Sequence, residues 1–164
     1  MKRNRASQTA DFAAAVRATY QYRPERALYE DPFAADLTSP LFRLAVRLSP
    51  LRRLVMERLF LYRLGASLTI LSRGRYAEEH FHRAYDRGIR QFIILGAGLD
   101  STALKFPARG ERIAIYELDH PSTQAVKKRR LRARKLHSPH AHHFLPIDFA
   151  RDRISDVLAA SAFD

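Results

Sequence analysis

The spacing of apolar residues along the chain changes after about residue 88. Before that point, apolar side chains recur at helical intervals, as in Phe12, Val16 and Tyr20, which are four residues apart. The same period predicts helices over 51–64 and 75–88, the second of which ends at a glycine. We expect the apolar stripe of 51–64 to face the core, with its arginines extending into solvent; a helix lying on a membrane surface is the alternative.

Beyond residue 88, short apolar segments alternate with helical ones. Segments 91–95, 111–119 and 140–148 have the composition of buried strands, while 120–136 and 151–161 have the pattern of helices. Alternation of strand and helix is typical of a parallel α/β sheet. The chain is therefore predicted to be an α/β protein with a helical segment in front of the sheet.

The expected division is an N-terminal helical segment over 1–88 and an α/β domain over 89–164. The 164 residues, 46% of them hydrophobic, are enough for one sizeable core. The absence of cysteine excludes disulfides and thiolate metal sites and is compatible with the cytoplasm. No apolar stretch approaches the roughly 18 residues that a membrane span requires.

The net charge of +12 raises the question of a nucleic-acid partner. Much of this charge lies in segments 43–75 and 127–135. The second segment has no interleaved aromatic residues, which single-stranded nucleic acids use for stacking. We therefore expect 127–135 to form the exposed face of a helix, and we do not expect nucleic acid to be the partner.

Two of the six glycines, Gly96 and Gly98, follow the first predicted strand directly. A strand that ends in Gly-x-Gly and leads into a helix lets a ligand approach the backbone and offers it helix amides. Ser101 stands where the dinucleotide fingerprint has its third glycine. The segment predicts a nucleotide-binding turn; a tight turn without a ligand is the simpler alternative.

Acidic residues follow this turn and end the next two strands. Asp100 comes directly after the turn, Glu117 and Asp119 end the second strand, and Asp148 ends the third. Because the carboxyl ends of parallel strands meet at one edge, we expect a nucleoside pocket there, in which a carboxylate accepts hydrogen bonds from a ribose diol. Glu117 and Asp119 share a strand face, so the pattern does not choose between them. Asp100 either contacts the ligand or orients the turn.

Five segments of the chain form a recognisable set: SQTADFAAAVRA, YEDPFA, SRGRYAEEHF, GIRQFIILGAGLDS and IYELDHPSTQAVKKRRL. Together they resemble the leucine carboxyl methyltransferase family, including its bacterial branch of S-adenosylmethionine-dependent O-methyltransferases, which is related to polyketide carboxyl methyltransferases. The resemblance extends from about Ser7 to Phe149.

The resemblance implies a class I methyltransferase fold, Rossmann-like, with S-adenosylmethionine as the cofactor. By position, Arg73 matches an arginine that pairs with the cofactor's carboxylate, and Arg17 lies near a second basic position for the same group. Gly96, Ala97 and Gly98 match the turn under the methionine portion of the cofactor. Asp119 matches the acid that binds the ribose, which favours Asp119 over its neighbour on the strand.

Asp148 and Phe149 match the Asp-Leu pair that lies beside the adenine in the family. After the glycines the family usually has Asp-Thr-Arg, whereas this chain has Asp100-Ser101-Thr102. A serine can still cap the following helix. Asp100 is therefore kept among the cofactor-binding candidates.

The reaction implied by the resemblance is methyl transfer to an oxygen, with the carboxylate of a small molecule or peptide as the expected acceptor. An acceptor that is already anionic needs no general base, so no catalytic residue is assigned. One alternative is a nicotinamide-dependent oxidoreductase, against which the missing third glycine argues. The other is a non-catalytic module that binds a nucleotide or nucleic acid.

In the family the sheet continues with four more strands, in the order three, two, one, four, five, seven, six. This chain stops at Phe163-Asp164, where the fourth strand would begin. We therefore expect an incomplete and inactive portion of the enzyme. The first strand would then be an apolar sheet edge, which favours self-association.

The histidine-rich segment 137–143 suggests a metal site. However, His140, His142 and His143 do not place three ligands on one strand face, and no cysteine or nearby acid completes a set. We expect no metal, and a solvated loop that enters the third strand.

Overall fold

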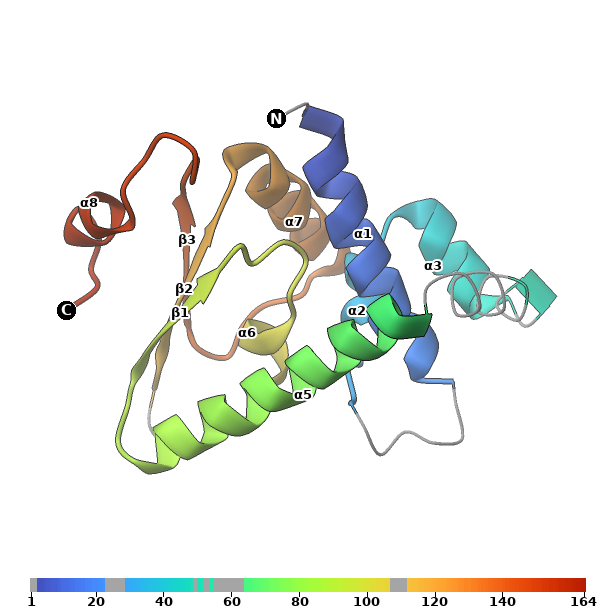
Figure 1. The fold of residues 1–164 in the computed structure, drawn as a ribbon, viewed down its shortest axis with the longest axis horizontal. Helices are drawn as coiled ribbons and strands as arrows, with labels where there is room; N and C mark the ends of the chain where they lie inside the picture. The colour runs from blue at the N-terminus through green and yellow to red at the C-terminus, as the bar shows by residue number, and fades with distance from the viewer. Residues whose placement is uncertain (1–2, 23–28, 49, 52–53, 55–63, 107–111) are drawn as a thin grey trace.

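The computed structural model describes the chain apart from residues 1–2, 23–28, 49, 52–53, 55–63 and 107–111. A parallel sheet has helices on both of its faces (Figure 1). The strands are β1 (Gln91–Leu95), β2 (Ala114–Asp119) and β3 (Ala141–Pro146). The helices are α1 (Arg3–Tyr20), α2 (Ala34–Leu37), α3 (Pro40–Arg47), α5 (Leu64–Asp86), α6 (Thr102–Lys105), α7 (Pro121–Arg134) and α8 (Ile154–Ala159).

The strand order is β1-β2-β3, and both pairings are parallel. Ala114 of β2 lies opposite Gln91 of β1 on one side and Ala141 of β3 on the other. The predicted α/β class and the order of the first three strands are thus confirmed. In the described chain no strand pairs with the outer edge of β1, where Leu95 is 56% exposed.

The alternation of side chains along β2 divides the core into two layers. Ile115 faces a cluster formed with α5 and α6, whose other members are Tyr85, Phe92, Ala103, Phe106 and Ile113. Tyr116 and Leu118 face the opposite side, where Val157 and Leu158 of α8 pack. Figure 1 shows α8 on one side of the sheet and the remaining helices on the other.

Helix α1 is enclosed by other helices over its second half. Residues 14–20 are all buried, and α1 contacts α2, α3, α5 and α7. The predicted apolar face is confirmed, since Val16 and Tyr20 are buried and Phe12 packs beside them. Small alanines, Ala14 and Ala18 among them, allow neighbouring helices to approach on the other sides.

Helix α5 is longer than predicted and begins at residue 64 rather than 75. It ends at Asp86 and is followed by the predicted capping glycine, Gly88, whose φ of 92° is in the left-handed region. The amide of Gly88 donates to the carbonyl of Tyr85, and the amide of Ile89 donates to that of Ala84, which is the Schellman arrangement. The predicted helix over 51–64 lies almost wholly outside the described residues, and α2 and α3 were not predicted.

Candidate functional site

The turn after β1 is built on two glycines in the left-handed region, with φ of 62° at Gly96 and 52° at Gly98. A Cβ on Gly96 would meet nothing within 4 Å, whereas one on Gly98 would lie 3.3 Å from the Cβ of Ala10. The group that approaches the backbone at Gly98 is therefore helix α1. The space beside Gly96 is open.

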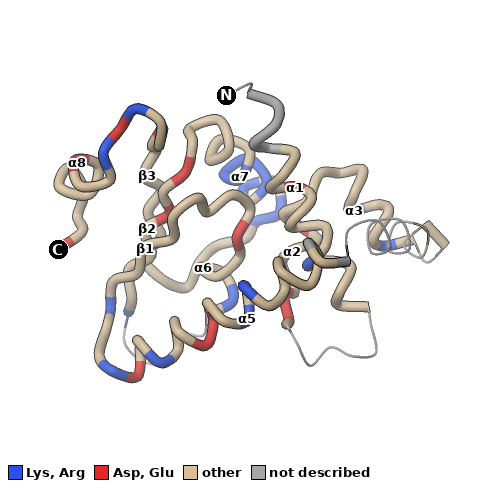
Figure 2. The backbone as a smooth tube through the Cα atoms, viewed as in Figure 1, with Lys and Arg blue, Asp and Glu red and all other residues tan. Residues whose placement is uncertain are grey.

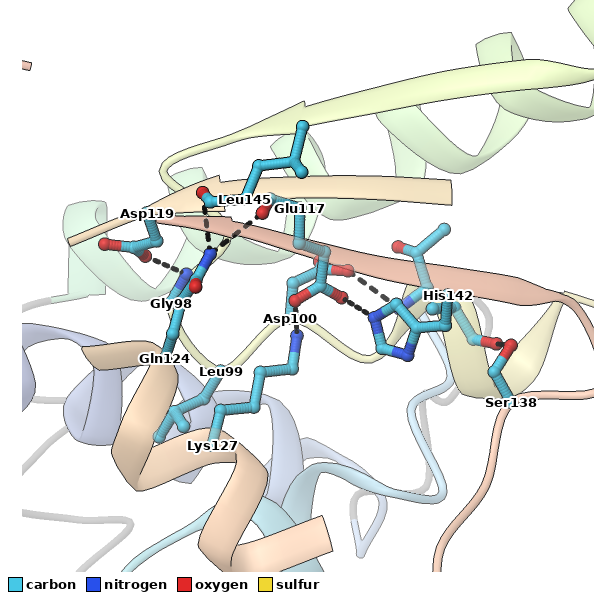
Figure 3. A network of polar contacts seen from close by, with 12 residues as sticks. Gly98, Leu99, Asp100, Glu117, Asp119, Gln124, Lys127, Ser138, His142 and Leu145 are labelled. Carbon is cyan, nitrogen blue, oxygen red and sulfur yellow. Dashed lines mark hydrogen bonds and ion pairs between the residues drawn. The ribbon is translucent and has the colours of Figure 1, made fainter. Parts of the chain in front are cut away.

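Asp119, at the tip of β2, joins this turn to the sheet. One carboxylate oxygen accepts a hydrogen bond from the backbone amide of Gly98 (Figure 3). The other accepts one from the amide of His120 at 2.5 Å. The side chain is only partly buried. Each carboxylate oxygen can accept more than one hydrogen bond, so capacity for a ligand's hydroxyls remains.

Glu117 shares a strand face with Asp119 but has different surroundings. It is 1% exposed, and its Oε2 lies 2.5 Å from Nζ of Lys127 while its Oε1 lies 2.8 Å from Nε2 of His142 (Figure 3). Both carboxylate oxygens are thus engaged inside the protein. The sequence pattern could not distinguish these two acids, but the structure does. Asp119 lies at the sheet edge and Glu117 in the interior.

Asp100 caps the short helix α6, because its Oδ1 accepts a hydrogen bond of 2.7 Å from the amide of Thr102. The expectation that Ser101 would provide this cap is wrong: its hydroxyl makes no side-chain cap bond and is buried without a hydrogen-bond partner among the described residues. Burial alone would raise the pKa of Asp100, but Lys127, Arg17 and the Thr102 amide hold it below its usual value. Asp100 is therefore a charged part of the turn.

Arg17 is buried and bonded within the protein. Its Nε donates to Oδ2 of Asp31 at 2.8 Å, and its Nη2 donates to the carbonyl of Leu99 at 2.7 Å. Burial alone would lower the pKa of Arg17, but the carboxylates of Asp31 and Asp100 raise it, so the guanidinium stays charged. Arg17, a predicted cofactor-binding residue, thus bonds to the turn from the side of α1. These two hydrogen bonds use Nε and Nη2, so Nη1 remains for another partner.

Arg73 lies exposed on α5, directly before Gly74. A Cβ on Gly74 would lie 2.9 Å from the ring of Tyr29, so the glycine lets this ring pack against the helix. Burial, together with Asp31 and Asp100, raises the pKa of Tyr29, which is therefore neutral. The YEDPFA and SRGRY segments meet at this contact.

Lys105 links α6 to two other segments of the chain. Its Nζ lies 2.9 Å from the carboxylate of Glu78 on α5 and donates to the carbonyl of Glu30 at 3.1 Å. The same ammonium lies 4.0 Å from the ring centroid of Tyr29. Nothing in the sequence pattern distinguishes this lysine from a surface residue.

The third strand ends beside Asp119, as the predicted pocket requires. The amide of Ile147 donates to the carbonyl of Asp119 at 3.0 Å, and Asp148 follows as the next residue. The Asp148 carboxylate accepts from the amide of Ala150 at 3.1 Å, and the Phe149 side chain is 47% exposed. The structure thus places Asp119 and Asp148 at one edge of the sheet.

Three of the four histidines of segment 137–143 are more enclosed than predicted, whereas His137 is exposed. His140 is buried, with Nε2 2.9 Å from the carbonyl of Phe106, and His142 contacts Glu117. His143 stacks on Tyr116 on the other face of the sheet, with ring centroids 4.6 Å apart. A solvated loop is therefore the wrong description of these three. Within the described ranges, no three histidine or acidic side chains are grouped as metal ligands would be.

The basic segment 127–135 was predicted to be an exposed helix face, and for Lys127 this is wrong. Figure 2 shows basic residues along α7, and Arg129, Arg132 and Arg134 are exposed. Lys127, however, is 1% exposed. Its position four residues after Thr123 and four before Leu131, both buried, is the signal that could have identified it.

Comparison with known proteins identifies the family. The sequence model of the leucine carboxyl methyltransferase family matches residues 10–164. The chain is 28% identical over 178 aligned residues to the Bacillus subtilis (strain 168) protein named "Putative S-adenosyl-L-methionine-dependent methyltransferase YktD", with 99% of this chain and 59% of that protein covered. Similarly named proteins are 35% identical in Frankia alni (95% of this chain, 49% of the relative) and 33% identical in Mycobacterium sp. strain JLS (95% and 52%).

The chain spans about half the length of the curated relatives it matches. None of the helices in the described part of the chain combines the length and apolar character needed to cross a membrane. The family match covers the N-terminal helices as well as the sheet. The chain belongs to the leucine carboxyl methyltransferase family.

Proposed function

We propose that this chain forms the cofactor-binding part of an S-adenosylmethionine-dependent O-methyltransferase. The observation that carries the proposal is the hydrogen bond from the Gly98 amide to the Asp119 carboxylate. It fixes a partly exposed carboxylate at a strand tip beside a glycine turn. Ribose binding in α/β folds uses such a carboxylate beyond a glycine turn. The names of the relatives support the choice of cofactor.

The residues present fit this cofactor in two respects. The backbone at Gly96 borders open space that a side chain would fill, so a ligand has access to the turn. The oxygens of Asp119 each accept one amide hydrogen bond and can accept another from the two hydroxyls of a ribose. Both features lie at the carboxyl edge of the sheet, where open α/β sheets bind their ligands.

Each proposed binding residue has a distinct part. Gly96, Ala97 and Gly98 would support the methionine portion of the cofactor, and Asp119 would accept hydrogen bonds from the ribose hydroxyls. Asp100 shapes the turn from below, because its carboxylate caps α6.

The rest of the proposed site comes from other elements. Asp148 and Phe149, which lie next to the end of β2, would bind the adenine. The cofactor's carboxylate would pair with Arg73, which is exposed, and with the remaining nitrogen of Arg17. In this division residues 1–88 form a helical cap on the cofactor-binding part, 89–164.

The proposed acceptor is a carboxylate of a small molecule or peptide. When bound, the cofactor supplies an electrophilic methyl group on a sulfonium. A carboxylate can take this group without losing a proton, so the protein's main task is to align the two reactants. The absence of an assigned general base in the described site is compatible with such an acceptor.

We also propose that the chain works in the cytoplasm and associates with itself through β1. The chain contains no cysteine, which suits a reducing compartment. The outer edge of β1 pairs with no strand in the described chain, and an apolar edge of this kind can pair with a second copy. Sedimentation velocity would show a dimer; a monomer at high concentration would contradict self-association.

Titration calorimetry tests the proposed cofactor against the rival class. The chain should bind S-adenosylhomocysteine, the product form of the cofactor, with one site per chain, and should give no binding heat with NAD⁺. Binding of NAD⁺ without binding of S-adenosylhomocysteine would favour the oxidoreductase alternative. Binding of neither would contradict the proposed pocket.

A further inference from the structure

Lys127 is a buried cation between the sheet and the glycine turn. Its side chain is 1% exposed, and its Nζ lies 2.5 Å from Oε2 of Glu117, whose side chain is also 1% exposed. His142 of β3 contacts the other oxygen of the same carboxylate at 2.8 Å. An ammonium in such a place is stable only because it is paired, and the sheet fixes its partner.

Asp100 of the turn lies close to this buried pair. Figure 3 shows the carboxylates of Asp100 and Glu117 close together, with the Lys127 side chain reaching toward them from α7. Lys127 is also the cation that most strongly keeps the pKa of Asp100 low against the effect of burial. One lysine is thus paired with a strand residue and acts electrostatically on a turn residue.

The arrangement extends into a row of alternating charges under the turn. Asp31 pairs with Arg17, whose field also acts on Asp100, and Asp100 is followed by Lys127 and Glu117. Each inner member of this row therefore has two opposite charges acting on it. The Leu99 carbonyl of the turn is bonded from the side of α1, and Asp100 lies near the Lys127–Glu117 pair (Figure 3).

We propose that Lys127 is a positioning residue, which holds the Gly96–Asp100 turn in its ligand-accepting conformation by anchoring Asp100 to Glu117 of β2. The ligand part of this inference rests on the proposed function. Lys127 acts through Asp100 and does not touch the cofactor. A simpler role, in which Lys127 only neutralises Glu117, would leave the turn unaffected when both charges are removed together.

Amide hydrogen exchange of the chain without ligand separates these two roles. The amides of Gly98, Asp100 and Thr102 donate to Asp119, to the Ala97 carbonyl and to Asp100 respectively, so they report on the turn. The variant Lys127→Met/Glu117→Gln removes both charges of the buried pair, so Glu117 is not left as an unpaired carboxylate. We expect these three amides to exchange at least tenfold faster than in the parent, beyond any change in the β2 amides.

Two further variants control this measurement. Arg129→Met removes one positive charge from an exposed position of α7, as Lys127→Met does from a buried one, and should exchange like the parent. Asp100→Asn keeps an oxygen to cap Thr102 but loses the charge that Lys127 attracts, so it should also loosen the turn. Parent-like turn exchange in either Lys127→Met/Glu117→Gln or Asp100→Asn would overturn the proposal.

Calorimetry with S-adenosylhomocysteine provides the second readout. Affinity should fall at least tenfold in Lys127→Met/Glu117→Gln and stay at the parent value in Arg129→Met. Faster turn exchange with unchanged affinity would overturn the positioning role. If the parent itself binds no S-adenosylhomocysteine, the proposed function fails, while the exchange data still decide whether Lys127 holds the turn.

Discussion

The guanidinium of Arg17 donates a hydrogen bond of 2.7 Å to the backbone carbonyl of Leu99, which lies 82 residues further along the chain. The same side chain forms a buried ion pair with Asp31. A helix near the N-terminus is thereby attached to the turn after the first strand. The N-terminal helices are thus part of what shapes the candidate site, in addition to covering it.

Replacing Arg17 should strongly destabilise the fold. In Arg17→Met the carboxylate of Asp31, which is fully buried, loses its cation. Breaking a buried pair in this way costs about 3–5 kcal/mol, which urea denaturation would measure. Arg75→Met, which breaks the exposed Arg75–Glu79 pair, should unfold like the parent. Equal free energies of unfolding for the two variants would show that the Arg17 contacts contribute little to stability.

Gly74→Ala should destabilise the protein even though alanine favours helices. The new Cβ would lie 2.9 Å from the Tyr29 ring, and overpacking of this kind costs about 1–3 kcal/mol. Gly65→Ala in the same helix meets open space and should leave stability unchanged or raise it by up to about 1 kcal/mol. Thermal unfolding of both variants checks the contrast; an equal rise in Tm would contradict the Tyr29 contact.

Asp100 should make the folded state sensitive to acid. Its pKa is lower in the folded protein than in an unfolded chain, so its charged form stabilises the fold at pH values above about 4. This contribution is lost as the pH falls through the folded pKa. Asp100→Asn should therefore lose less stability between pH 6 and pH 3 than the parent does, as measured by urea denaturation at each pH. Parallel pH profiles would contradict a low pKa.

The sheet could be predicted because its strands are short apolar segments separated by a helix of the right length. The edge that holds Asp119 and Asp148 followed from the same pattern, since residues at the ends of parallel strands must meet. The family resemblance then favoured Asp119. The structure gives a physical reason, because Glu117 is occupied by Lys127 and His142.

The contacts that hold the turn could not be predicted in the same way. Arg17, Asp31 and Leu99 are brought together only by the packing of α1, and no local period encodes that meeting. The sequence also does not determine whether Asp100 or Ser101 caps α6. Both residue types cap helices, and the backbone conformation decides which side chain reaches the amide.

The most direct test of the central claim is a calorimetric cycle between Asp119 and the ribose hydroxyls. Asp119 also binds the amide of Gly98, so Asp119→Ala alone could weaken binding merely by loosening the turn. Titrating the parent and Asp119→Ala with S-adenosylhomocysteine and with its 2′,3′-dideoxy analogue separates the two effects, with the exposed Asp86→Ala as a charge-matched control. Hydrogen bonds to a charged group are worth about 1.5–3 kcal/mol each. We therefore predict that Asp119→Ala weakens binding of S-adenosylhomocysteine by about a hundredfold or more and binding of the analogue far less, while Asp86→Ala changes neither. Equal losses for the two ligands, or no loss for either, would contradict the claim that Asp119 receives the ribose.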